Sequence, residues 1–283
     1  MSRTAVLTAL VLRSRPSGES NSEVFLLTAE EGIIRATVFG GPKSKLRAFA
    51  SPYNSGQVWV YRDKTKDYAK LSDFDVRSWR PGLREMYDRT MAAAAVAETI
   101  LSSHGGGGEW GSALKFAVET LDTLESANEE LCSRLLVHFL WRWSGFLGIQ
   151  PHLDSCSGCG LPAPAFPAQE SIAPLWFNIL EGCALCANCV SFNSNQRFGE
   201  RLTENPNQRF PVQRTGSKEQ RTEESALIKL NPGCRRWLSV VSGLEPSLLH
   251  RYSMDHKSFS EAMALVCAVL TGVLGKRLSS WDW

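Results

Sequence analysis

The sequence lacks the short motifs that mark the common catalytic sites. Its 283 residues contain no HExxH metal motif, no P-loop, no GxSxG nucleophile turn and no dinucleotide fingerprint. The five histidines are scattered, and none lies beside a candidate nucleophile in a recognisable arrangement. We therefore expect a protein that is not an enzyme.

Long hydrophobic runs are also missing. The most apolar stretches, 91–100 and 262–274, are about 10 to 13 residues long, whereas a bilayer-spanning helix needs roughly 20. No small-residue cleavage signal follows the apolar residues near the start. We expect no membrane span and no export. In a cytoplasmic protein, paired CxxC motifs bind metal more often than they form structural disulfides.

Net charge is small, at +2, but it is unevenly distributed. Residues 1–80 carry 13 Lys or Arg against 8 Asp or Glu, a net +5, and the rest of the chain is net −3. The composition, 43% apolar and 21% charged, is that of a globular protein, and the length fits about two domains. The amino-terminal part is therefore the basic one.

Short runs rich in β-branched and aromatic residues fill this basic part, separated by Gly, Pro, Asn and Ser clusters. They predict five strands, over 4–13, 23–29, 33–39, 57–61 and 69–76. Five short strands at this spacing favour an OB-fold, a small barrel that binds oligonucleotides on one face. A small SH3-like barrel or a sandwich would leave much the same pattern.

After residue 80 the hydrophobic period becomes helical. Helices are expected over 85–103, 111–124, 128–147, 232–242 and 258–278. Residues 151–195 are instead rich in Pro, Cys and Gly, and 191–224 is a polar tract typical of an exposed loop or hairpin. The fold class is therefore α+β and multidomain: an OB-fold β-barrel followed by a helical domain with a cysteine-bearing insertion.

The insertion holds the strongest local signal, a CSGC motif and a CANC motif separated by 26 residues. Two-residue spacers let a tight turn aim both sulfurs of a pair at one tetrahedral Zn²⁺, and four thiolates leave no position open for catalysis. The expected structural zinc, about one per chain, is bound by Cys156, Cys159, Cys186 and Cys189. Spacing alone also allows Cys183 with Cys186 as the second pair, or His152 as a ligand.

A thioredoxin-like redox pair is the less favoured interpretation, because Gly160, Pro162 and Pro164 interrupt any helix after the first motif. The chain is then expected to divide into four segments: 1–80 as the OB-fold nucleic-acid-binding domain, 81–150 as the first part of the helical domain, 151–225 as its zinc-binding insertion with the polar loop, and 226–283 as its last part.

Residues 41–70 concentrate positive charge, with seven Lys or Arg against two Asp. Such a concentration of positive charge favours binding to a phosphate backbone, because each neutralised phosphate releases condensed counterions. Trp59 and Tyr61 lie among these cations, and aromatic side chains give bases a surface on which to stack. The alternative is that these aromatics are partly packed on a strand while the lysines solvate a loop.

The order of these parts resembles the RecO family of bacterial recombination mediators. The resemblance rests on 8–32 (TALVLRSRPSGESNSEVFLLTAEEG), 38–53 (VFGGPKSKLRAFASPY), CSGCG at 156–160 and GCALCANC at 182–189. Members with the metal site usually show GGxLCxxC, whereas Cys183 here replaces the second glycine. That pattern favours Cys186 and Cys189 as ligands.

The resemblance implies a cytoplasmic, nucleoid-associated protein that binds single- and double-stranded DNA and anneals complementary strands. It also implies partners: the acidic carboxy-terminal tail of the single-strand-binding protein, and RecR, with which RecA is loaded. For phosphate contacts we expect Lys43, Lys45 and Arg47 first and Arg13 and Arg35 next, with Trp59 and Tyr61 for stacking. For the tail peptide the candidates are Arg134, Arg142, Lys276 and Arg277. The competing hypothesis is a zinc-stabilised protein-interaction scaffold.

Overall fold

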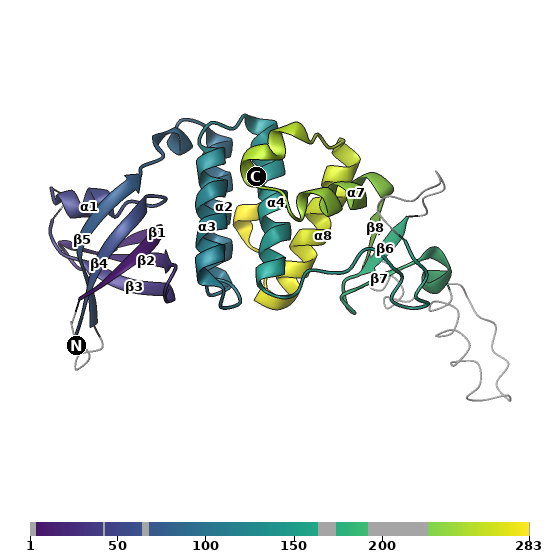
Figure 1. Cartoon of the computed structure of the whole chain (residues 1–283), viewed down its shortest axis with the longest axis horizontal. Coiled ribbons are helices and arrows are strands. Elements are labelled where there is room, and N and C mark those ends of the chain that lie inside the picture. Colours follow the sequence, from purple (N-terminus) through teal and green to yellow (C-terminus); the bar gives the residue numbers. More distant parts are fainter. Residues whose placement is uncertain (1–3, 42, 64–67, 164–173, 192–225, 283) are drawn as a thin grey trace, which may run out of the picture. The chain divides into compact units, whose positions relative to one another are not determined.

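The computed structural model describes residues 4–41, 43–63, 68–163, 174–191 and 226–282 (Figure 1). They form two compact units. The first unit comprises Met1–Ile149, Val241–Tyr252 and Leu274–Trp283, and the second comprises Gln150–Val240 and Ser253–Val273. The predicted polar tract 191–224 lies outside the described residues from position 192 onward.

The first unit begins with a closed five-stranded barrel. Its strands follow the order β1-β2-β3-β5-β4, and β4 pairs back onto β1. The strands are β1 (Thr4–Ser17), β2 (Asn21–Thr28), β3 (Gly32–Val38), β4 (Ser55–Asp63) and β5 (Tyr68–Ser78). A short helix, α1 (Lys45–Phe49), connects β3 to β4. This closed order is that of an OB-fold, so the predicted barrel is confirmed.

Alternation along β2 and β4 determines which of their side chains form the core of the barrel. In β4, Val58 and Val60 are fully buried, while Trp59 and Tyr61 point to the outer face and are half-buried. In β2, Val24 and Leu26 are buried in the same core. Because successive side chains of a strand point to opposite faces, one face of each of these strands supplies the core and the other faces outward.

Three helices continue the first unit: α2 (Tyr87–Ser102), α3 (Trp110–Leu124) and α4 (Glu129–Phe146). They pack side by side (Figure 1). The side chain of Asn128 caps α4 by accepting a hydrogen bond from the backbone N–H of Leu131 at 2.9 Å. Along the buried side of α4, Phe139 and Trp143 stack with ring centroids 5.3 Å apart. Short 3-10 helices over Pro81–Arg84, Pro246–Arg251 and Ser279–Trp281 complete the unit.

The second unit is built on a three-stranded antiparallel sheet that the sequence pattern did not predict. Its order is β7 (Cys183–Leu185), β6 (Leu175–Asn178) and β8 (Leu227–Leu230). Two helices follow, α7 (Pro232–Val241) and α8 (His256–Leu274), close to the predicted ranges. Asn231, just before α7, links the two helices. Its side chain accepts a hydrogen bond from the backbone N–H of Cys234 on α7 at 2.8 Å, and its own backbone N–H donates to Glu261 on α8 at 2.5 Å.

One described helix, α8, is long and apolar enough to cross a membrane, judged by length and composition only. A single such helix is weak evidence, because the core helix of a soluble protein passes the same test. Ala262, Leu265 and Leu270 of α8 are fully buried. The absence of a membrane span stays a prediction.

Acid should destabilise the first unit through a buried histidine on α4. Burial and the nearby charge of Arg142 lower the pKa of His138 to about 4 from an ordinary value of 6.5. The neutral ring shares a hydrogen bond with the carbonyl of Val241, 3.1 Å away. The unfolded chain therefore binds a proton at higher pH than the folded one, and the stability is full above about pH 6.5 and falls toward pH 4.

Between about pH 7 and pH 5 we expect His138 to account for a loss of about 2 kcal/mol in the free energy of unfolding. Urea titrations of the wild type and of His138→Gln, whose amide can keep the hydrogen bond but does not titrate, measure this contribution. The loss should be smaller by that amount in the variant. Equal losses in both proteins would contradict the assignment.

Candidate metal centre and nucleic-acid interface

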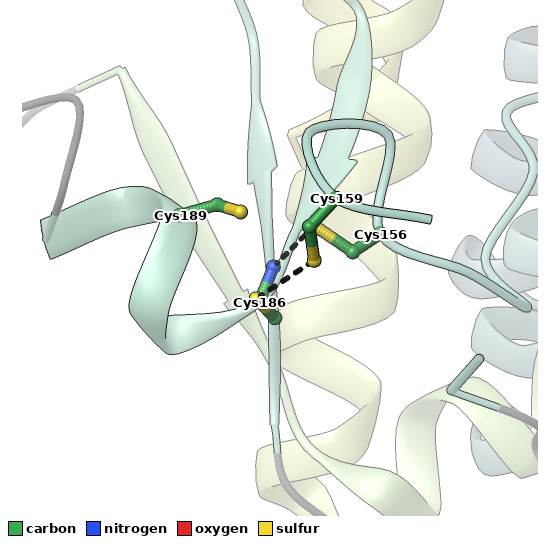
Figure 2. A group of neighbouring side chains, drawn as sticks. All are labelled: Cys156, Cys159, Cys186 and Cys189. Atoms are coloured by element: carbon green, nitrogen blue, oxygen red, sulfur yellow. Dashed lines mark hydrogen bonds between the residues drawn. The ribbon is translucent and has the colours of Figure 1, made fainter. Parts of the chain in front are cut away.

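Four cysteines from two short segments meet in the second unit (Figure 2). Cys156 and Cys159 come from the turn that starts at residue 156, Cys186 follows β7 directly, and Cys189 lies on a helical turn over 187–191. Their four Sγ atoms all lie within 4.8 Å of one another. The two CxxC motifs therefore converge on one point, as the sequence predicted.

Local backbone geometry makes this convergence tight. The N–H of Gly160 donates to the carbonyl of Cys156 at 2.8 Å, and Gly160 has a φ of +70°, a conformation that favours glycine. A Cβ added at Gly158 would lie 3.0 Å from the Sγ of Cys189. The two glycines after the first cysteine thus allow both the turn and the close approach of the second motif.

The spacing of the sulfurs suits a tetrahedral zinc ion. Zn–S bonds of about 2.3 Å place the sulfurs of a tetrahedral site about 3.8 Å apart. The Sγ atoms of Cys159 and Cys186 are 3.8 Å apart, and the backbone N–H of Cys186 donates to the Sγ of Cys156 at 3.2 Å (Figure 2). The four residues can therefore hold one zinc ion in a closed, non-catalytic site.

The thiols of the cluster differ in acidity. Burial raises the pKa of Cys156, but backbone N–H groups of Cys186, Cys159 and Gly158 donate to its sulfur and together lower the pKa to about 6. Hydrogen bonds with Cys159 and Cys156 raise the pKa of the Cys189 thiol to about 12. Donors aimed at one sulfur favour the thiolate, which is the form that binds metal.

Cys183 lies outside this group. Its thiol donates to the Glu181 carboxylate at 3.6 Å, and its pKa is raised by burial and by that carboxylate. His152 is not part of the cluster either, among the residues that the structure describes. The geometry thus brings together the set with Cys186 and Cys189 and leaves out the alternatives that spacing allowed.

On the barrel, the three residues expected first at phosphates lie on or just before α1. Lys43 and Lys45 are exposed, and Arg47 is half-buried. No ion pair within the described ranges involves any of the three. Within the part of the chain that the structure describes, these three positive charges have no carboxylate partner at the β3–β4 connection.

The other two predicted phosphate contacts share one row of the outer face. Arg13 of β1 lies opposite Phe25 of β2, which lies opposite Arg35 of β3. The guanidinium of Arg15 sits over the Phe25 ring, 5.2 Å from its centroid. Glu23 pairs with both Arg15, at 2.5 Å, and Arg35, at 3.2 Å.

Sequence reasoning missed Phe25 and Arg15. Only the strand register shows that Phe25 lies between two arginines, and register cannot be read from a single strand. The alternation of β2, with Val24 and Leu26 in the core, was the available signal that Phe25 faces outward.

Trp59 and Tyr61 lie on a different part of the barrel surface. Trp59 pairs with Val6 of β1 and Tyr61 with Lys70 of β5. Phe39, 43% exposed, is a further aromatic here, with the ammonium of Lys70 5.3 Å from its ring centroid. β4 pairs with β1 over residues 4–10 of β1, and Arg13 lies beyond this range. Trp59 and Tyr61 are therefore not in one row with Arg13 and Arg35.

The helical arginines considered for a partner peptide already have intramolecular partners. Arg134 donates to the carbonyl of Tyr252 at 2.6 Å, and its side chain is only 10% exposed. Arg142 donates to the carbonyl of Leu244 at 2.9 Å and covers the Phe116 ring. Arg277 pairs with Asp282 at 2.5 Å, and Lys276 is exposed.

The fold and its clustered residues define an OB-fold protein with a basic outer surface, a helical bundle and a separate four-cysteine unit. Two family models match the chain: "Recombination protein O N terminal" over residues 1–79 and "Recombination protein O C terminal" over residues 84–197. The boundary between them falls at the end of the barrel, before α2.

Curated relatives agree with these matches, and each is named "DNA repair protein RecO". The protein from Pelotomaculum thermopropionicum is 29% identical over 190 residues, 66% of this chain and 69% of the relative. The one from Anaeromyxobacter dehalogenans is 30% identical over 191 residues, 66% of this chain and 70% of the relative. The chain belongs to the RecO family.

Proposed function

We propose that this protein is a DNA repair mediator that binds single- and double-stranded DNA and anneals complementary strands. With RecR it would help to load RecA onto DNA coated by single-strand-binding protein. The observation that supports it most directly is the OB barrel with Lys43 and Lys45 exposed and unpaired in the described part of a RecO-family chain.

Annealing requires that the repulsion between two phosphate backbones be neutralised while the bases stay accessible. Cations on α1 and on the row of Arg13 and Arg35 supply the neutralisation. Phe25, Trp59 and Tyr61 offer rings on which unpaired bases stack, each contributing roughly 1 to 3 kcal/mol. Nothing in this role needs nucleotide hydrolysis or a catalytic residue, and it would be carried out in the cytoplasm at the nucleoid.

The zinc that Cys156, Cys159, Cys186 and Cys189 would bind serves structure. Four thiolates complete the tetrahedron, so no position remains for water, and the ion crosslinks the turn at 156 to the residues that follow β7. Its role would be to hold the second unit together.

For the acidic tail of the single-strand-binding protein we propose the end of the chain, at Lys276 and Arg277. Lys276 is exposed, and the pair of Arg277 with Asp282 is half-exposed and therefore weak. Arg134 and Arg142 are less suited, because backbone carbonyls already accept their hydrogen bonds.

The DNA-binding role is tested by removing the α1 cations together. Each phosphate contact on single-stranded DNA adds about 0.7 to the slope of log affinity against log salt. Lys43→Ala, Lys45→Ala and Arg47→Ala combined should lower that slope by about 2 and the affinity roughly 100-fold at moderate salt. Fluorescence anisotropy with a labelled oligonucleotide across a salt series measures both.

Lys115→Ala is the matched control, because this lysine is exposed on α3 and pairs with Glu119, 3.7 Å away, on the same helix. It should leave both quantities unchanged. Weak, salt-insensitive binding by the wild type would instead support the protein-interaction scaffold.

A further inference from the structure

A pocket of about 360 Å³ opens on the barrel surface where β1, β2 and the α1 segment meet. Its polar lining is supplied by Ser14, Arg15, Ser22, Arg47 and Ser51. Arg15 belongs to β1 and Arg47 to α1, so separate elements contribute to the lining. Among the residues that the structure describes, no acidic side chain lines the pocket.

This lining has the chemistry of a phosphate site. Guanidinium groups present paired N–H donors in the planar arrangement that matches phosphate oxygens, and hydroxyl groups can donate to the oxygens that remain. Ser22 is only 2% exposed, so its hydroxyl group lies within the fold where it meets the pocket. The lining therefore combines the positive charge of Arg47 with three short neutral donors.

The pocket has more room than a phosphate group alone would fill. The remaining wall is Pro16, Ala48 and Pro52, which are small, apolar and not aromatic. Such a wall suits the ring of a sugar and offers no surface for stacking a base. The lining thus matches a phosphate with its attached sugar.

We propose that this pocket holds one sugar-phosphate of a bound nucleic-acid strand, at the strand end or within it. The inference rests on the proposed DNA-binding function and assigns one defined phosphate position to it. Arg47, which has no ion pair within the described ranges, is the anchor.

The Arg15 guanidinium is engaged elsewhere, because it donates to the carboxylate of Glu23 at 2.5 Å and lies over the Phe25 ring. The positive charge offered to a phosphate in the pocket is therefore that of Arg47.

Titration of the full-length protein with inorganic phosphate, followed by phosphorus NMR line broadening, tests the pocket directly. Arg47→Lys keeps the charge but loses the paired donors, and Ser51→Ala removes one hydroxyl group; both should weaken phosphate binding several-fold. Lys115→Ala is the control and should bind phosphate like the wild type.

Oligonucleotides that differ only in a 5′-phosphate or a 5′-hydroxyl group show which phosphate enters. A preference for the phosphorylated strand that Arg47→Lys abolishes places a strand end in the pocket. Equal binding of both strands, weakened by Arg47→Lys, places an internal phosphate there.

The two proposals fail in different ways. If the wild type binds DNA but Arg47→Lys and Ser51→Ala match Lys115→Ala with every probe, the pocket is not a phosphate site and the proposed function stands. If the wild type binds phosphate through Arg47 but binds no DNA, the proposed function fails and with it the assignment to nucleic acid.

Discussion

Replacing Cys186 by alanine is expected to abolish zinc binding and to unfold the second unit. Cys186 follows β7, and its thiol and backbone both contact the other cysteines of the cluster. Structural zinc sites contribute about 10 to 16 kcal/mol of apparent binding free energy at neutral pH, and much of it stabilises the fold around the ion. The strands of this sheet are only three and four residues long, so their backbone hydrogen bonds are too few to replace the stabilisation that the ion supplies.

The measurement is the zinc content of the purified protein together with its resistance to proteolysis. Wild type should hold about one zinc ion per chain, and Cys186→Ala close to none, with rapid cleavage in the second unit. Cys183→Ala is the matched control, because that thiol lies three positions away but outside the cluster. Zinc loss in both variants, or in neither, would contradict the ligand set.

Replacing Arg80 by methionine should destabilise the first unit by about 2 to 4 kcal/mol, because two acceptors at the junction lose their charged donor, whereas the half-exposed Asp122 regains water. The Arg80 side chain is fully buried. It donates to Asp122 of α3 at 2.7 Å, to the carbonyl of Tyr53 at 2.5 Å and to the hydroxyl group of Ser55 at 3.0 Å. It therefore fastens the barrel to the helices.

Urea denaturation followed by tryptophan fluorescence measures this loss. Arg77→Met is the control, because Arg77 is exposed on β5, and it should change stability by less than about 0.5 kcal/mol. The account of the junction would be wrong if both variants unfolded at the same urea concentration as the wild type.

The barrel could be predicted from the sequence because its signal is local. Each strand carries its own alternation, as Val58 and Val60 do around Trp59, and closure follows from the number and spacing of the strands. The helix α1 was missed, because five residues with two cations carry no readable apolar face and no residue of α1 is fully buried.

The small sheet of the second unit could not be predicted for a different reason. Strands β6 and β7 are four and three residues long, too short for alternation to be recognised, and β8 lies about 40 residues further along the chain. The metal cluster was predictable nevertheless, because the paired CxxC spacing carries its own geometry. The sequence could not settle whether Cys183 is a member of the cluster. Its thiol bonds to Glu181, and the spacing of the cysteines does not reveal that direction of the side chain.

The proposed DNA interface on the barrel could be predicted from the sequence only in part. The cations on α1 were visible as a run in the sequence, whereas the row of Arg13, Phe25 and Arg35 exists only once β1, β2 and β3 pair in register. The network of Arg15, Glu23 and Arg35 could not be foreseen for the same reason. Residues that act together across strands are set by tertiary structure.

Annealing of two complementary oligonucleotides without nucleotide, followed by fluorescence quenching, tests the central claim most directly. The account predicts that the wild type accelerates annealing, that this acceleration declines steeply with salt, and that the combined Lys43, Lys45 and Arg47 alanine variant loses most of it while Lys115→Ala keeps it. Annealing at the uncatalysed rate with wild-type protein, or undiminished acceleration by the combined variant, would contradict it.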